Sequence, residues 1–509
     1  MIKFIIFLSI FLLTKSTPLV ISPTTHLFID SLNRERFFHG VNIIMKRHPY
    51  YPITDHFDPL LSFHEIDMQN FEAWGLNIIR LGTQWPGYEP IQGQYNETYL
   101  DILEEIVNQS GQHNIYTLLD FHQDILNEKF CGEGIPSWAV KEPSEAWAFP
   151  RPVQLTPYKL NSEGLPSEED CNTHGWAAYY FAYETAAAFQ NLYDNVEGVQ
   201  DNFGEFWRRV AERFDTNDYV MGYELINEPF AGNVITNPLR LTPTYADHYN
   251  LMPMYDYLND YIRKNDTNHL VFFQSVTWDD MIPVGFSHPP GGEQYGNRSV
   301  LSYHYNEQVN FNLDWQVKAR FNDRNRLQCG SMCTEFGSCP SSQKEFDDME
   351  SQMNVFDEYL ESWIGWSSKL FGNYTGDCGT LYDNNGVLNM RVVEKLSRTY
   401  AQAVAGRTQS MKYDNVTKNF SLVYSICGEC QGETEIYLNE DVHYENGFDV
   451  TVDGSVEWYQ PKKNRVHLKR KESSKDGDLV KISISRKSNR ANDEMNYLGE
   501  KAKITKIIN

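Results

Sequence analysis

Eight short apolar or alternating runs recur along the first three quarters of the chain, each followed by a loop and usually by a helical pattern. The runs cover residues 37–46, 77–85, 116–122, 220–229, 269–276, 299–306, 331–337 and 362–368. Strands that alternate with helices predict a parallel sheet, and eight such units predict an α/β fold of the (β/α)8 type, a TIM barrel. A doubly wound sheet is the alternative, but it usually needs fewer strands and often carries a glycine-rich phosphate turn, which the sequence lacks.

Most of these runs end in polar residues. The polar ends are Lys46, Arg80, residues 120–124, Asn227, Glu228, residues 303–305, Glu335 and Trp366. In a (β/α)8 barrel the C-terminal ends of the strands form one mouth, where substrates bind. A single buried glutamate can be an ion-pair partner in a core, but polar residues at so many strand ends are better explained by one shared site.

A connection of about 95 residues, 125–219, separates the third predicted strand from the fourth. It is rich in Pro, Trp and Tyr and carries Cys131 and Cys171. A loop of this length is usually functional or has its own structure. We interpret it as a wall or lid of a substrate cleft, and the alternative is an excursion without function that a disulfide holds in place.

Two modules are predicted after an N-terminal leader. A helix over 390–405 is expected to close the barrel, which would occupy residues 17–406. Short alternating strands separated by turns then predict a C-terminal antiparallel β-sandwich over 407–490. Residues 491–509 form a charged tail.

Residues 1–16 are predicted to be a signal peptide, because Lys3 precedes an apolar run and small residues follow it. We therefore expect a secreted, extracellular protein, with a lysosome-like compartment as the alternative. Seven Asn-x-Ser/Thr sequons are consistent with a secreted glycoprotein. The formal net charge of −25 argues against binding to nucleic acid, which depends on Lys and Arg.

Eight cysteines fit an oxidising compartment and predict four disulfides. We expect Cys131 to pair with Cys171 and Cys427 with Cys430. Two further bridges are expected among the four remaining cysteines, which are Cys329, Cys333, Cys339 and Cys378. Zinc is the competing interpretation for Cys427 and Cys430, but no second Cys or His pair of suitable spacing follows.

Two glutamates at strand ends have the chemistry of a glycosidase. Glu228 ends the fourth strand, where Pro229 prevents further pairing, and Glu335 ends the seventh. These strands lie roughly across the barrel, so one carboxylic acid can protonate a glycosidic oxygen while the other carboxylate meets the anomeric carbon. A separation of about 5–5.5 Å would give retention through a covalent intermediate. Asn227 is expected to donate to the sugar 2-hydroxyl, and Glu224 to be a polar residue of the barrel interior.

The motifs around these glutamates resemble those of glycoside hydrolase family five, in its retaining barrel clan. Asn227-Glu228-Pro229 and the Thr-Glu-Phe-Gly setting of Glu335 carry the resemblance, which covers residues 25–405. It is supported by Arg80, His122, His304 and Trp366. The resemblance implies that Glu228 is the acid/base, that Glu335 is the nucleophile and that Trp366 lines the subsite at the cleaved bond. We expect Arg80 to orient Glu335.

Within the family, the chain is most similar to endoglycoceramidases. Residues 40–46 with Pro49-Tyr50, residues 120–124 and the appended sandwich carry this resemblance. It implies cleavage between an intact oligosaccharide and ceramide, with Lys46, Asp120 and Asp124 contacting the glucose next to the lipid. The family usually has His-x-Tyr at strand six, whereas this chain has Tyr303-His304-Tyr305-Asn306. Which tyrosine supports the nucleophile therefore stays open.

The predicted function is a retaining endo-β-glycosidase on glycosphingolipids, without cofactor and without metal. His122, Asn227, His304, Tyr305 and Trp366 complete the predicted sugar site. The lipid half is expected on an apolar groove formed partly by the long connection, with peripheral contact to a membrane through exposed aromatics. The alternatives are an exo-β-glucosidase on glucosylceramide or steryl glucosides, an endoglucanase on soluble β-glucans, and a catalytically inactive glycolipid-binding protein.

Overall fold

The computed structural model describes residues 19–143, 147–276, 282–305, 312–337, 340–372 and 381–487. The predicted signal peptide and charged tail lie outside the described residues, as do Cys339 and Cys378. No helix of the described part is both long enough and apolar enough to cross a membrane.

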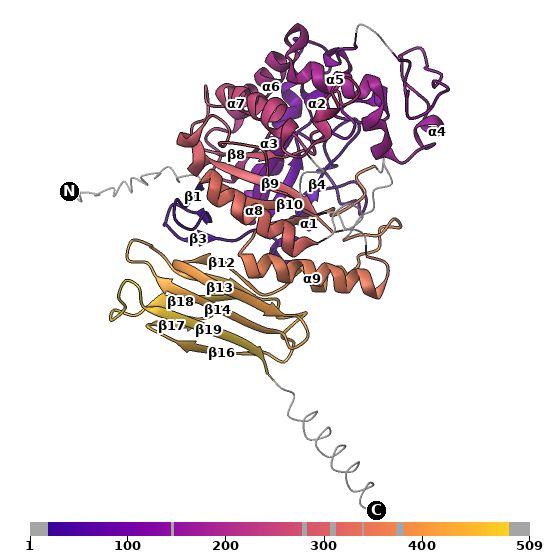
Figure 1. Ribbon diagram of the computed structural model, residues 1–509. Coiled ribbons are helices and arrows are strands. Elements are labelled where there is room, and N and C mark those ends of the chain that lie inside the picture. The colour runs from indigo at the N-terminus through magenta and orange to yellow at the C-terminus, as the bar shows by residue number, and fades with distance from the viewer. Residues whose placement is uncertain are drawn as a thin grey trace, which may run out of the picture.

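Eight parallel strands close into a barrel, in the order β10-β11-β4-β5-β6-β7-β8-β9 (Figure 1). The strands are β4 (His39–Ile43), β5 (Ile78–Gly82), β6 (Tyr116–Asp120), β7 (Val220–Glu224), β8 (Leu270–Gln274), β9 (Ser299–Tyr305), β10 (Gly330–Phe336) and β11 (Trp363–Gly365). Nearly all of their residues are buried, because both faces of a parallel barrel sheet are covered. The predicted barrel is confirmed, with a strand in each of the eight runs, of which β10 begins one residue earlier than predicted.

Helices surround this barrel and cover its outer face (Figure 1). The helices of the described chain are α1 (Glu65–Trp74), α2 (Trp85–Tyr88), α3 (Glu97–Gln112), α4 (Glu168–Cys171), α5 (Tyr183–Tyr193), α6 (Val199–Phe214), α7 (Met252–Ile262), α8 (Leu313–Leu327), α9 (Gln343–Tyr359) and α10 (Met390–Leu396). Of these, α4 lies in the long connection, away from the barrel (Figure 1). The longer ones are amphipathic; α6, for example, buries Phe203, Phe206, Trp207, Val210 and Phe214 against the strands.

The barrel interior is apolar at one end and polar at the other. Ile78, Leu118, Phe272, Val300 and Met332 belong to one buried cluster inside the barrel. Two residues further along β5, β6, β9 and β10, the same face of each strand carries a polar side chain, because side chains alternate with a period of two. These residues are Arg80, Asp120, Ser302 and Thr334. The polar layer lies at the C-terminal ends of the strands and forms the floor of the mouth.

Two antiparallel sheets form the second module, whose core contains side chains from both. The first sheet has the order β1-β2-β3-β12-β15-β18-β17 and the second has the order β13-β14-β19-β16. Their strands are β1 (Val20–Ile21), β2 (Phe28–Ile29), β3 (Glu35–Arg36), β12 (Tyr400–Val404), β13 (Gly406–Asp414), β14 (Asn419–Ile426), β15 (Thr434–Tyr437), β16 (Phe448–Asp453), β17 (Val456–Tyr459), β18 (Arg465–Arg470) and β19 (Leu479–Arg486).

The junction of the modules differs from the predicted division at residue 406. The helix predicted over 390–405 ends at Leu396, and β12 follows it as a strand of the first sheet. Strand β3 pairs with β12, so the segment before the barrel also belongs to this sheet. Short apolar runs such as residues 400–404 do not reveal by their pattern whether they are helix or strand. The Tyr400 and Tyr437 hydroxyls donate to carbonyl oxygens at the end of α1, which ties the sandwich to the barrel.

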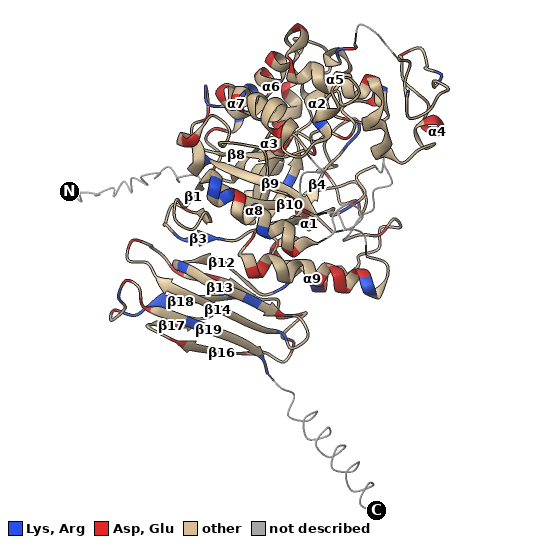
Figure 2. Cartoon of the chain, in the orientation of Figure 1, with Lys and Arg blue, Asp and Glu red and all other residues tan. Residues whose placement is uncertain are grey.

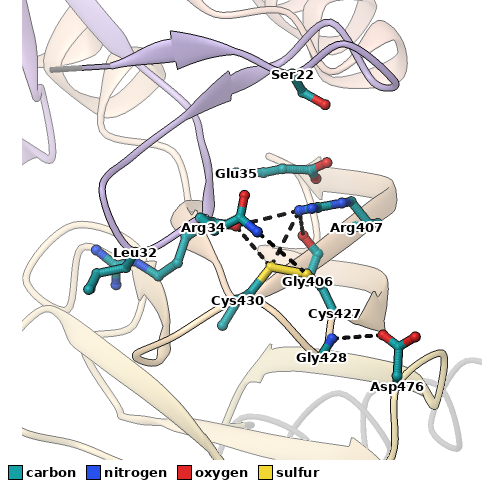
Figure 3. The surroundings of a disulfide bond; sticks show 12 residues. Ser22, Leu32, Arg34, Glu35, Gly406, Arg407, Cys427, Gly428, Cys430 and Asp476 are labelled. Atoms are coloured by element: carbon teal, nitrogen blue, oxygen red, sulfur yellow. Dashed lines mark hydrogen bonds between the residues drawn. A yellow bond between two sulfur atoms is a disulfide. The ribbon is translucent and has the colours of Figure 1, made fainter. Parts of the chain in front are cut away.

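Two disulfides are present among the described residues, Cys131–Cys171 and Cys427–Cys430, as predicted. Figure 3 shows the second, in the connection between β14 and β15, where the Arg407 guanidinium donates to Cys430 Sγ at 3.3 Å. The expectation of bridges that include Cys329 is wrong for the described cysteines. Cys329 is a buried thiol whose pKa burial raises to about 12, so it stays protonated and inert.

Candidate active site

A buried arginine on β5 organises the barrel mouth. Arg80 is fully enclosed and contacts Glu224 Oε2 at 2.5 Å, Asn42 Oδ1 at 3.0 Å, Asn227 Oδ1 at 2.8 Å and Asp120 Oδ1 at 2.9 Å. Burial disfavours its charge, but the nearby carboxylates outweigh that effect and hold the pKa of Arg80 above its ordinary value. Arg80 is therefore a permanent cation that links β4, β5, β6 and β7.

Glu224 lies in the barrel interior, where the sequence analysis placed it. Its side chain is fully buried and accepts hydrogen bonds from Arg80 and from the Thr334 hydroxyl, the latter at 2.9 Å. Both of its oxygens are engaged by the protein. Glu224 therefore supports the floor of the mouth. The carboxylate that remains available for the reaction is that of Glu228, four residues later.

Side-chain amides fix the turn that follows β7. Gln123 Nε2 donates to the carbonyl oxygens of Asn227 at 2.7 Å and of Glu228 at 2.9 Å, and Asn227 Nδ2 donates to the Gln123 carbonyl at 3.0 Å. The Glu228 amide donates to Gln274 Oε1 at 2.8 Å. Glu228 has a φ of 37°, in the left-handed region that non-glycine residues rarely adopt. Hydrogen bonds on both sides of the residue hold this strained backbone, and with it the direction of the carboxylate.

The two predicted catalytic glutamates meet at one histidine. His304 Nδ1 lies 2.8 Å from Glu228 Oε1 and 3.7 Å from Glu335 Oε2. One ligand atom from each of the three residues lies within 4.8 Å of the others, so the two carboxylates approach each other that closely. This separation fits the about 5–5.5 Å of retaining glycosidases and is too short for the water of an inverting enzyme, which needs about 6.5–9.5 Å.

The charges of this cluster set its protonation. Burial and the neighbouring Glu228 carboxylate raise the pKa of Glu335 to about 7, against the lowering effects of His304 and of Arg80, whose Nη1 is 3.6 Å away. Burial disfavours the charged form of His304, but Glu335 and Glu228 outweigh it and raise the pKa of His304 to about 9. Below about pH 7, Glu335 therefore holds a proton beside a charged imidazolium, within reach of the neighbouring carboxylate.

A second polar cluster lies next to the catalytic pair. The His122 ring stacks on Trp366 at a centroid distance of 5.5 Å, and His122 Nδ1 lies 3.0 Å from Asp120 Oδ2. Lys46 Nζ contacts Asp124 Oδ2 at 2.6 Å and lies 5.0 Å from the centre of the Trp366 ring. Burial works against the charge of Asp124, but Lys46 and His122 hold its pKa well below the usual range. The ionised Asp124 carboxylate and two donors, Lys46 and His122, thus surround the flat face of an indole, an arrangement that suits a sugar ring.

The structure brings the predicted site residues together with one exception. Tyr303 and Tyr305 flank His304 on β9 and therefore face the other side of the strand, where both belong to the hydrophobic cluster that contains Leu313 and Val317 of α8. Tyr305, predicted to bind substrate, is thus placed away from the face of β9 that carries His304. Residues 306–311 lie outside the described part of the chain.

Glu133 was not predicted and belongs to the second cluster. Its carboxylate is buried and lies 3.5 Å from Lys46 Nζ, and its backbone pairs with that of Asp124 in both directions. Gly132 and Gly134 flank it, and a Cβ at Gly132 would meet the Asp124 carbonyl oxygen at 1.9 Å. This Gly-Glu-Gly turn is the signal in the sequence that could have identified the position. Glu133, Asp124 and His122 have the ligand atoms of a metal site, and the Lys46 ammonium contacts both of these carboxylates.

The long connection lines a cavity of about 700 Å³ that begins at Lys46 and Glu133. Its lining carries ionisable side chains of both signs, including Arg47, Glu128 and His174. It also contains apolar side chains, among them Ile135 and Leu165. The polar groups offer hydrogen-bond donors and acceptors for a hydroxyl-rich ligand. The apolar groove for lipid, expected to be formed partly by this connection, stays a prediction.

Comparisons with known proteins agree with this geometry. Residues 64–372 match the model of "Cellulase (glycosyl hydrolase family 5)", and residues 398–484 match that of "Glycoside hydrolase family 5 C-terminal domain". The chain is 43% identical over 472 residues to an endoglycoceramidase of Cyanea nozakii, covering 91% of this chain and 93% of that protein. It is 44% identical over 447 residues to an endoglycoceramidase of Hydra vulgaris, covering 87% and 85%.

A solved structure shares the fold at lower identity. Endo-glycoceramidase II from Rhodococcus sp., in a complex with ganglioside GM3, superposes with a TM-score of 0.70 at 22% identity, over 91% of this chain and 99% of that one. The likeness extends through both modules, so the barrel and the sandwich occur together in both proteins.

Proposed function

The chain belongs to glycoside hydrolase family 5, and we propose that it hydrolyses the bond between the glucose of a glycosphingolipid and its ceramide. It is a retaining glycosidase that releases the intact oligosaccharide. The observation that carries the mechanism is the approach of the Glu228 and Glu335 carboxylates to within 4.8 Å across a polar, partly enclosed mouth. We assign Glu335 as nucleophile and Glu228 as acid/base.

Substrate binding determines which glutamate carries the proton of the catalytic pair. The glycosidic oxygen accepts a hydrogen bond only from a protonated Glu228, and the electron-poor anomeric carbon is stabilised by an ionised Glu335. Arg80 and the charged His304 lie 3.6 and 3.7 Å from Glu335 Oε2 and favour its ionised form. Both effects move the proton to Glu228 as the sugar enters.

The reaction then proceeds in two displacements. Glu335 forms a bond to the anomeric carbon while the bond to the ceramide oxygen breaks, and the proton of Glu228 passes to that oxygen, so ceramide leaves as the alcohol. In the second step, Glu228 takes a proton from water, the hydroxyl oxygen bonds to the anomeric carbon and Glu335 is released. Asn227 keeps a second N–H on Nδ2 that is directed to the sugar 2-hydroxyl in this assignment.

Lys46, Asp124, His122 and Trp366 hold the glucose in this account, with Asp120 behind His122. Their chemistry is complementary to a glucose ring, since Lys46 donates, Asp124 accepts and the indole offers a flat face to C–H groups. The 700 Å³ cavity beyond Lys46 supports endo action, because an exo enzyme has no use for space beyond the terminal sugar.

Incubation with a ganglioside tests the proposed function. We expect the whole glycan and ceramide as the first products, resolved by mass. An exo-β-glucosidase would leave the ganglioside intact and cleave only glucosylceramide, and an endoglucanase would cleave soluble β-glucans without touching the lipid. A Glu335→Gln variant that retains wild-type turnover would remove the nucleophile assignment and would favour a site elsewhere.

Contact with a lipid surface and secretion are part of the proposal. Exposed apolar side chains on the connections after β6 and β7 support peripheral binding; they are Leu155, Leu160, Leu239, Leu241 and Tyr249. We expect the protein to float with neutral phosphatidylcholine vesicles at high salt, since apolar rather than charged contacts hold it. The apolar segment at residues 4–13 and the two disulfides support entry into the secretory route, and we propose export from the cell as its end, with a lysosome-like compartment as the alternative. Epitope-tagged protein in the culture medium would confirm export.

A further inference from the structure

The cavity next to the catalytic mouth has two walls from different parts of one connection. Residues 127–137, directly after β6, form the first wall, and residues 165–176 form the second. Lys46 closes the end that adjoins the glucose site. The cavity lies beside the ends of β4, β5 and β6, whereas Glu228 follows β7 and Glu335 lies near the end of β10.

This position determines which half of the substrate the cavity receives. In the proposed function, the glucose lies among Lys46, Asp124 and Trp366, and the ceramide oxygen faces Glu228. The remaining sugars extend from the glucose away from Glu228, past Lys46 and into the cavity. Its mixed donors and acceptors, together with the Trp176 ring, match the hydroxyl groups and the flat faces of sugars.

The first wall is rigidly attached to the barrel. Asp124 and Glu133 exchange both backbone hydrogen bonds, at 3.0 and 2.8 Å, and the Ile135 amide donates to the Leu126 carbonyl at 2.8 Å. Gly134 has a φ of 144°, and a Cβ there would lie 2.6 Å from Gln123 Cβ, so the turn is pressed directly against the strand end. Cys131 precedes this turn.

The second wall has little packing of its own. In the described segment 159–178 no side chain is buried, and α4, which is acidic (Figure 2), exposes Glu168 and Glu169 to solvent. The wall is joined to the first wall by the Cys131–Cys171 disulfide, and the Tyr179 hydroxyl donates to the carbonyl oxygen of Cys171 at 2.9 Å. A segment without buried apolar contacts has low local stability, so a covalent link largely determines where it lies.

We propose that the Cys131–Cys171 disulfide sets the glycan specificity by holding the second wall over the sugars beyond the glucose. These cysteines are positioning residues and do not touch the reacting atoms. The ligand class is the distal part of a neutral or acidic oligosaccharide linked through glucose. The inference rests on the proposed function, because it takes its orientation of the substrate from there.

Two substrates with one leaving group measure the effect. The first is a nitrophenyl β-glucoside, and the second is the nitrophenyl β-glycoside of a tetrasaccharide that ends in the same glucose. The readout is the ratio of their kcat/KM values, tetrasaccharide over glucoside. In the double variant Cys131→Ser/Cys171→Ser, we expect the ratio to fall by roughly tenfold. This factor corresponds to the loss of one or two hydrogen bonds to the distal sugars.

The second disulfide supplies the matched control. Cys427 and Cys430 lie in the sandwich, and Cys427→Ser/Cys430→Ser should leave the ratio at the wild-type value (Figure 3). Trp176→Ala tests the same wall without breaking a covalent bond, since Trp176 is 37% exposed and its loss does not threaten folding. Trp147→Ala is its control, because Trp147 is on the same connection, is 44% exposed and does not line the cavity.

The outcomes separate this inference from the proposed function. A lowered ratio in Cys131→Ser/Cys171→Ser and in Trp176→Ala, with both controls unchanged, supports it. An unchanged ratio in both test variants overturns it, as does a wild type that prefers the glucoside; if the double variant does not fold, Trp176→Ala alone decides. A wild type that fails to release ceramide from glycolipid but shows the ratio change refutes the proposed lipid substrate and leaves the cavity's preference for longer glycans in place.

Discussion

Replacement of Arg80 by Met should destabilise the barrel far more than the loss of a surface arginine. Arg80 forms ion pairs with Glu224 at 2.5 Å and with Asp120 at 2.9 Å, and all three side chains are fully buried. Met fills a similar volume without charge, so both carboxylates would stay buried and lose their cation. Removal of one partner of a buried pair costs about 3–5 kcal/mol, and we expect at least that loss in the free energy of unfolding.

Arg213 is a matched control for this substitution. It also contacts three carboxylates, those of Glu97, Asp101 and Glu104, but it lies on the surface, and Arg213→Met should cost about 0–1 kcal/mol. Urea unfolding followed by tryptophan fluorescence measures both variants. Adding Glu224→Gln to Arg80→Met should recover part of the loss, because it removes one unpaired charge. The reasoning is refuted if Arg80→Met costs no more than Arg213→Met, or if the second substitution recovers nothing.

Three further predictions concern the reaction. Glu228→Gln should lower kcat/KM on glycolipid by about 10²–10⁴-fold but affect a nitrophenyl glycoside much less, because nitrophenolate leaves without a proton; equal losses on both would contradict the acid role. Burial and Glu228 raise the pKa of Glu335 to about 7, so the proton of the catalytic pair is present below that pH and lost above it. We therefore expect kcat/KM to fall as the pH rises through about 7, and a flat pH profile up to pH 9 would contradict this. Lys46→Met should raise the pKa of Asp124, measured by NMR titration, and lower kcat/KM roughly tenfold or more; an unaltered rate would place the glucose elsewhere.

The part of the site that lies at strand ends was predictable from sequence. Arg80 and Glu335 occupy equivalent ends of parallel strands, and the geometry of a barrel brings such ends together whatever the loops do. The prediction that Glu228 and Glu335 face each other across the barrel followed from the positions of the fourth and seventh strands. The distance between their carboxylates could not be predicted, because it depends on the left-handed turn at Glu228 and on the side-chain amides that hold this turn.

The features that could not be predicted from the sequence depend mostly on contacts between segments that lie apart in the chain. Glu133 lies 13 positions after Asp120 and reaches the site only because two glycines allow its turn to press against Asp124. Tyr305 was predicted to bind substrate together with His304, although the period of two in a strand sends adjacent side chains to opposite faces. The sheet position of β12 depends on pairing with β3 and β15, which lie far away in the chain.

Trapping of the glycosyl-enzyme tests the central claim most directly. A 2-deoxy-2-fluoro β-glycoside with a good leaving group slows the second displacement, so a covalent adduct should accumulate and be located by peptide mass spectrometry. The account predicts one sugar bound to Glu335, and a β-anomer as the first product of the unmodified substrate. A label on Glu228, or an α-anomer formed without any adduct, would contradict it.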